Sequence, residues 1–203
     1  MELPFDQLLS TLTTSADAAS GWSACCDALD GAAPSTIWAD LRKLDAARDV
    51  AACAGWLAEQ LADAAEFLHE VDAGAPRGVA VWLDPQALAD DEGWCLEIGA
   101  TSECDPAEDT LDWTERCPWV GDFHLVDGLV EAERAWLMPR NADVRDLAEY
   151  ASFLFYGGLI LRHALTGAGL GGPWLVAWGF VEGDQGLLAR GDGADVTPLA
   201  LLG

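Results

Sequence analysis

Positive charge is what this sequence has least of. Its 203 residues include 35 acids and only 10 bases, which gives a formal net charge of −25, and Lys43 is the one lysine. Nucleic acids and anionic membranes bind basic surfaces, so this charge argues against both as partners. It is compatible with a basic protein partner or with mimicry of a polyanion. Solubility or adaptation to high salt would also account for it, because net charge governs association rather than fold.

A leader-like start and a long apolar run are also missing. Glu2 and Asp6 stand where a secretory signal needs positive charge, and no apolar segment follows them. The longest apolar run, from Ala151 to Leu161 with Ser152 inside it, is shorter than the roughly 20 residues that cross a bilayer. The six cysteines show neither CxxC spacing nor a dense framework. We therefore expect a cytoplasmic protein with reduced thiols.

Apolar residues make up 51% of the chain, which is enough for a full core, and 203 residues suit a single domain. The first 71 residues carry apolar positions at helical spacing, with a break at 30–34. Gly55 either weakens the last of these helices or divides it in two. The segment 72–77 predicts a linker, which is the one internal boundary that the sequence offers.

Beyond this linker the apolar pattern changes from helical to extended. The runs 79–84 and 95–101 alternate apolar and other side chains, and they suit two antiparallel neighbours in a sheet. Residues 119–120 and 123–126 are weaker strand candidates. The sequence of elements up to this point is helices followed by strands.

A strong helix is predicted from an N-cap at Asp143 to about Leu165, apolar on nearly every side and therefore buried. Its Gly157-Gly158 pair suits the close approach of another element. Residues 174–190 then predict a hairpin. Together these patterns predict an α+β fold: a helical N-terminal third followed by a mostly antiparallel sheet packed on one buried helix.

The segment from Asp90 to Asp127 stands out by its charge. It holds twelve carboxylates and one base, Arg116, with tryptophans interleaved among them. Aromatic side chains flanked by charges are typical of protein-binding surfaces, since they bury much area with few torsions to fix. Each tryptophan taken alone is more readily explained by the core than by a binding surface. The partner-binding residues that we predict are Asp91, Glu92, Trp94, Glu103, Asp105, Asp109, Asp112 and Trp113.

Motifs for metal, nucleotide or nucleophilic chemistry are weak. Thiolates and imidazole suit zinc, but the candidate ligands have irregular gaps, and thiols among so many carboxylates stay protonated. Gly167–Gly172 matches GxGxxG but follows a helix and precedes a strand, the reverse of a dinucleotide site. Asp192–Asp195 is read as a turn. We assign no catalytic residue, metal or cofactor. The zinc candidates considered were Cys95, Cys104, Cys117 and His124.

One resemblance bears on function. The run from Trp94 to Thr101, followed by Asp105-Pro106, Asp109 and Asp112-Trp113, resembles segments of small acidic immunity-type proteins of bacterial polymorphic toxin systems. The resemblance implies a cytoplasmic protein that binds a cognate toxin domain. It covers about a tenth of the chain and transfers no functional residue.

The leading hypothesis from the sequence is a non-enzymatic immunity protein or antitoxin that occludes a basic toxin domain. Electrostatic steering would bring the partners together, tryptophan anchors would be buried, and carboxylates would pair with Lys and Arg. The alternatives are a secretion chaperone or adaptor for a protein client, and a small enzyme that uses a cysteine or a metal.

Overall fold

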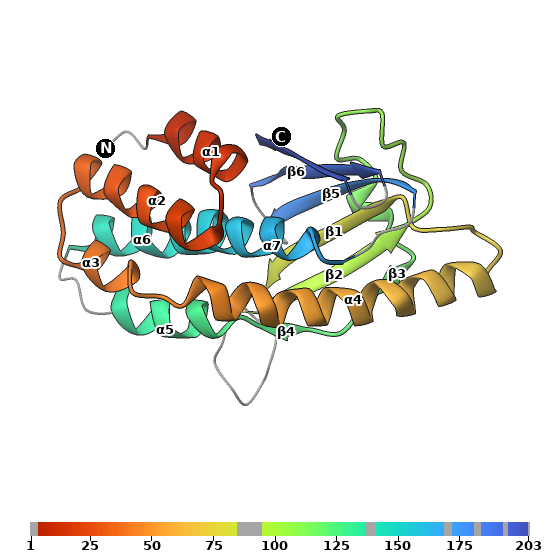
Figure 1. Cartoon of the computed structure of the whole chain (residues 1–203), viewed down its shortest axis with the longest axis horizontal. Helices are drawn as coiled ribbons and strands as arrows, with labels where there is room; N and C mark the ends of the chain where they lie inside the picture. The colour runs from red at the N-terminus through yellow and green to blue at the C-terminus, as the bar shows by residue number, and fades with distance from the viewer. Residues whose placement is uncertain are drawn as a thin grey trace.

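A computed structural model of the chain describes residues 4–84, 95–136, 141–168, 172–180, 184–192 and 195–202. It has the predicted α+β fold, with a helical N-terminal part and a mixed, mostly antiparallel sheet. In Figure 1 the red-to-orange N-terminal helices lie at one side of the molecule and the strands at the other, and the longest helix runs along the sheet. No helix in the described ranges has both the length and the apolar character to cross a membrane.

The helical spacing of the first 71 residues is confirmed. Asp17 and Asp45 cap two of the helices, since each carboxylate accepts a hydrogen bond from the backbone N–H three residues on. Gly55 does not divide the last helix, because the buried stripe that includes Trp56 and Leu57 outweighs the helix propensity that one glycine loses. The four helices are α1 (Phe5–Thr14), α2 (Ala18–Ala32), α3 (Ile37–Leu41) and α4 (Ala46–Glu70).

Seven strands form one sheet in the described part of the chain, in the order β3-β2-β1-β5-β6-β7, and β4 also pairs with β2. Every pair is antiparallel except β1 with β5. The predicted strand pair and the hairpin are both confirmed, whereas the last strand was not predicted. The strands are β1 (Gly78–Asp84), β2 (Cys95–Thr101), β3 (Trp119–Val120), β4 (His124–Leu125), β5 (Pro173–Phe180), β6 (Gln185–Asp192) and β7 (Asp195–Leu202).

The predicted buried helix is a continuous run in three parts: α6 (Ala142–Ala151), the π-helix η2 (Ser152–Gly157) and α7 (Gly158–Leu165). The N-cap prediction was wrong: Asn141 caps α6, and its side chain accepts a 3.0 Å hydrogen bond from the backbone N–H of Asp143. Gly158 does allow a close approach. A Cβ there would lie 2.9 Å from the indole Nε1 of Trp178, which donates to the carbonyl of Leu154.

The two faces of the sheet are covered differently. Val79 and Val81 point to the helices and lie in the main core, whereas Ala80 points the other way into a second, smaller core. The main core extends from Leu8 on α1 to Ala189 on β6, so the helical part packs on the sheet. The second face is covered by the segment that follows β2, which packs Cys104 and Trp113 into the smaller core.

Candidate protein-binding surface

The second face of the sheet is covered by residues 102–118, which we call the acidic loop. It follows β2, contains the short 3₁₀ helix η1 (Thr114–Arg116), and leads into β3. Arg116 is its one base. Each of its carboxylate side chains is exposed: Glu103, Asp105, Glu108, Asp109, Asp112 and Glu115.

Trp113 anchors the acidic loop to the sheet. Its side chain is only 4% exposed and lies in the second core with Cys104, Ala80 and Leu175, while its indole N–H donates to the carbonyl of Thr110 at 2.9 Å. Gly78 on β1 makes room for it. A Cβ at this glycine would lie 2.7 Å from the Cβ of Cys104 and 2.8 Å from a ring carbon of Trp113, closer than real Cβ atoms approach.

Polar contacts fix the loop at further points. The hydroxyl of Thr114 donates to the carbonyl of Leu111 at 2.9 Å and lies 3.3 Å from Oε1 of Gln185 on β6. Asp109 accepts a 2.6 Å hydrogen bond from the guanidinium of Arg190, also on β6. A half-exposed ion pair such as this contributes about 0–1 kcal/mol, so the burial of Trp113 is the stronger restraint. The carboxylates are thus presented on a loop with a defined shape.

The structure brings together four of the predicted contact residues. Glu103, Asp105, Asp109 and Asp112 are all exposed on the acidic loop. Trp113 is in the same loop but faces the core, so it supports the surface rather than offering a side chain to a partner. Asp91, Glu92 and Trp94 lie outside the described residues. Glu108 and Glu115, which the prediction omitted, share the exposed surface; their place in the same acidic run was the only signal for them.

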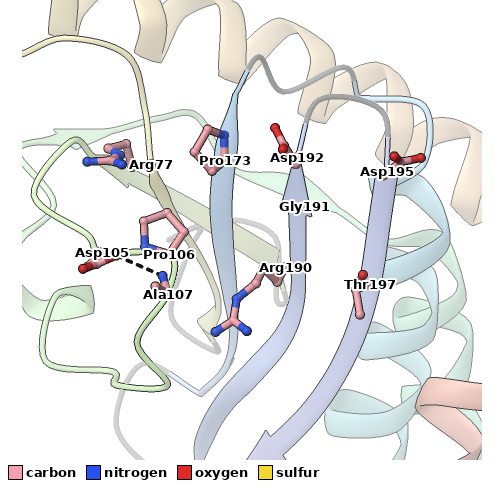
Figure 2. A pocket seen from close by; sticks show the side chains of 10 residues that line it. All are labelled: Arg77, Asp105, Pro106, Ala107, Pro173, Arg190, Gly191, Asp192, Asp195 and Thr197. Atoms are coloured by element: carbon pink, nitrogen blue, oxygen red, sulfur yellow. Dashed lines mark hydrogen bonds between the residues drawn. The ribbon is translucent and has the colours of Figure 1, made fainter.

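A cavity of about 430 Å³ lies between the acidic loop and the ends of β5, β6 and β7; we call it the loop-side cavity. Figure 2 shows Arg77 and Arg190 beside the loop residues, and Asp192 and Asp195 at the ends of β6 and β7. Sequence reasoning missed this cavity, because its residues come from segments far apart in the chain. Its lining is Arg77, Asp105, Pro106, Ala107, Pro173, Arg190, Gly191, Asp192, Asp195 and Thr197.

The candidate zinc ligands are divided between the two faces of the sheet. Cys104 lies in the second core, whereas His124 pairs with the core residue Leu96 and stacks on Trp56 of α4 at 5.1 Å. Burial raises the pKa of Cys104 to about 11 and that of Cys117 to about 12, so both are protonated thiols at neutral pH. In the described ranges, no three His, Cys, Asp or Glu side chains are placed to share a metal ion.

Among the described residues, the most buried charged group is Asp49 on α4, which is 2% exposed. Its carboxylate accepts hydrogen bonds from the hydroxyl of Tyr156 (2.5 Å), the backbone N–H of Gly128 (2.9 Å) and the guanidinium of Arg48 (3.2 Å). Gly128 stands at the start of α5 (Asp127–Trp136), where a negative charge is favourable. Burial, with the adjacent Asp49, raises the pKa of Tyr156. The hydrogen bonds of the Asp49 carboxylate thus connect α4, α5 and η2, and the buried carboxylate is not accessible to a substrate.

No protein-family model, curated protein or solved structure matches this chain. Its function is therefore inferred from its own residues. Of the surfaces described above, the acidic loop and the cavity beside it combine exposed functional groups with a fixed backbone.

Proposed function

We propose that this chain is an acidic binding protein that occludes a basic protein partner, in the manner of a cytoplasmic immunity protein or antitoxin that neutralises a toxin domain. One observation carries the proposal: six exposed carboxylates lie on one loop, and the buried Trp113 fixes that loop on the sheet. A fixed array of like charges favours a partner of opposite charge over one of the same charge. Free thiols at Cys25, Cys26, Cys53 and Cys117 suit the reducing cytoplasm.

Binding would begin with electrostatic attraction. A net charge of −25 creates a field that attracts a basic domain and raises its association rate by about 10- to 1,000-fold at low salt. Salt screens such attraction, with a Debye length of about 10 Å at 0.1 M. Because the backbone of the acidic loop is already ordered, little conformational entropy is lost when its carboxylates pair with Lys and Arg.

An apolar centre for the interface is available next to the loop. Three of the four exposed large apolar side chains in the described residues are Val120 (55% exposed), Phe123 (45%) and Leu125 (42%), all on or between β3 and β4. Strand register places Val120 opposite Gly99 and Leu125 opposite Cys95, so both point to the face that the acidic loop covers. Apolar residues beside charged ones are the usual make-up of an interface. They replace Trp113 as the apolar contacts of the proposed surface.

The test compares two variants of equal charge change. The loop variant is Glu103→Gln, Glu108→Gln and Asp112→Asn, whose side chains make no described hydrogen bond or ion pair. The control variant is Glu59→Gln, Asp63→Asn and Glu66→Gln on the exposed face of α4.

Wild type and both variants are immobilised and exposed to a lysate of the source organism at low salt, then eluted with a salt gradient, and the bound proteins are identified. We expect one basic protein to be retained by wild type and by the control variant, and to be lost from the loop variant. Retention of the same proteins by the loop and control variants would overturn the assignment of the acidic loop.

A further inference from the structure

The lining of the loop-side cavity carries charges of both signs. Its volume of about 430 Å³ lies within the usual range of small-molecule sites. The chain has 35 acids and only 10 bases, yet two arginines, Arg77 and Arg190, line this one cavity. Pro106 and Pro173 give it a partly apolar wall.

Both arginines have hydrogen-bond donors to spare. In the described part of the chain, the side chain of Arg77 makes no hydrogen bond or ion pair. Arg190 donates from one terminal nitrogen to Asp109, but its Nε is buried without an acceptor. A buried donor without an acceptor is unfavourable. Guanidinium groups bind carboxylates in a planar, two-pronged arrangement, so a ligand carboxylate would pair with the exposed side chain of Arg77 and with the second terminal nitrogen of Arg190.

The other side of the cavity carries two aspartates. Asp192 and Asp195 are register partners at the ends of β6 and β7, and carboxylates directly opposite each other on paired strands repel. Asp192 is two residues from Arg190, which places their Cα atoms about 7 Å apart along the strand. Figure 2 shows these aspartates at the strand ends and both arginines on the side of the acidic loop. The cavity therefore has two arginines, together with Asp105, on one side and two aspartates on the other.

We propose that the loop-side cavity binds a basic amino acid, with its carboxylate on Arg77 and Arg190 and its side-chain cation between Asp192 and Asp195. The overall charge favours a basic ligand: two arginines and three aspartates, Asp105 included, leave the lining with one net negative charge. The same chemistry exists in a free amino acid and in the C-terminal Lys or Arg of a polypeptide. This site does not depend on the proposed protein partner.

The first test is calorimetric titration of the full chain at low salt with L-arginine, and with two analogues that each lack one recognised group. Agmatine lacks the carboxylate, and L-citrulline lacks the side-chain charge. We expect L-arginine to bind and each analogue to bind at least about 10-fold more weakly, since each leaves charged groups of the site unpaired. No heat from L-arginine at about 10 mM, or equal affinity for agmatine, would overturn the proposal.

Single substitutions then test which residues form the L-arginine site. Arg77→Gln changes an exposed side chain with no described hydrogen bond or ion pair, so we expect the fold to be retained and L-arginine binding to weaken about 10-fold or more. Asp195→Asn should do the same. Arg134→Gln on α5 and Asp63→Asn on α4 are the matched controls, both exposed and on helices. If the cavity variants bind L-arginine as well as these controls do, the site is elsewhere and the proposal is wrong.

A final arm separates the two sources of the ligand. The peptide Gly-Gly-Arg is titrated with a free C-terminus and as its amide. Tighter binding of the free-acid peptide than of L-arginine would identify a polypeptide C-terminus as the ligand, and weaker binding would identify the free amino acid. Equal binding of the acid and the amide would contradict the role given to Arg77 and Arg190.

Discussion

Replacing Trp113 should weaken the packing of the acidic loop on the sheet. The side chain is 4% exposed, packs against Cys104 and Leu175, and donates one hydrogen bond to Thr110. Removing a buried tryptophan side chain usually costs about 3–5 kcal/mol, because apolar contacts are lost and a cavity remains. For a chain of this length, each 1 kcal/mol lowers the melting temperature by about 2–4 °C. Trp113→Ala should therefore lower it by about 6–20 °C.

Trp113→Phe is the matched variant. It retains most of the buried ring and loses the indole N–H, so we expect a loss of only about 1–2 kcal/mol in the free energy of unfolding. Urea denaturation measures both values. Cleavage by a glutamate-specific protease at Glu103, Glu108 or Glu115 reports on the loop itself, because these residues are exposed there.

Cleavage of native Trp113→Ala should be faster than that of wild type, with Trp113→Phe between them. A loss below about 1 kcal/mol together with unchanged cleavage would refute the idea that this tryptophan holds the loop.

Three further predictions concern the rest of the fold. Tyr156→Phe removes a donor from the buried carboxylate of Asp49 and should cost about 1.5–3 kcal/mol in urea denaturation; a cost below about 0.5 kcal/mol would mean that the pair contributes little. Burial lowers the pKa of His124, so its folded form resists protonation. The stability that His124 contributes by staying neutral is fully present above the unfolded pKa of about 6.5. It is lost as the pH drops through that value towards the lower folded pKa. Between about pH 7.5 and 5.5, the free energy of unfolding should therefore decrease less steeply for His124→Gln than for wild type. Identical slopes for the two proteins would exclude this effect. Burial raises the pKa of Cys25 and Cys53 to about 12, so iodoacetamide at about pH 8 should label both far more slowly in native than in unfolded protein; equal rates would show that they are accessible.

Strong local patterns predicted much of the fold. The helical stripe around Trp56 and the alternation in 79–84 each specify an element within a few residues, and the structure has both. The last strand, β7, was missed because it contains Pro198 and begins at Asp195, residues that suit a turn. Proline is tolerated there because β7 is at the edge of the sheet, where a backbone N–H need not pair.

Charge alone located the candidate surface, but it did not decide which side chains face outwards. Trp113 and the neighbouring Asp112 belong to the same acidic run, yet one lies in the second core and the other is exposed. Gly78 on β1 makes room for the indole, so Trp113 can turn into the second core while Asp112 stays exposed. The loop-side cavity was unpredictable for a similar reason, because pairing of β5 with β1 and β6 brings Arg77 and Arg190 to the same cavity.

The dependence of the association rate on salt shows whether the acidic loop steers the partner to its binding surface. The basic protein retained by wild type is mixed in a stopped-flow instrument with wild type, the loop variant (Glu103→Gln, Glu108→Gln, Asp112→Asn) and the α4 control variant. At about 20 mM salt the loop variant should associate at least about 10-fold more slowly than wild type, and the difference should shrink by about 500 mM. The control variant should stay close to wild type. Equal rates for the loop variant and wild type at low salt would contradict the claim that the acidic loop steers and binds the partner.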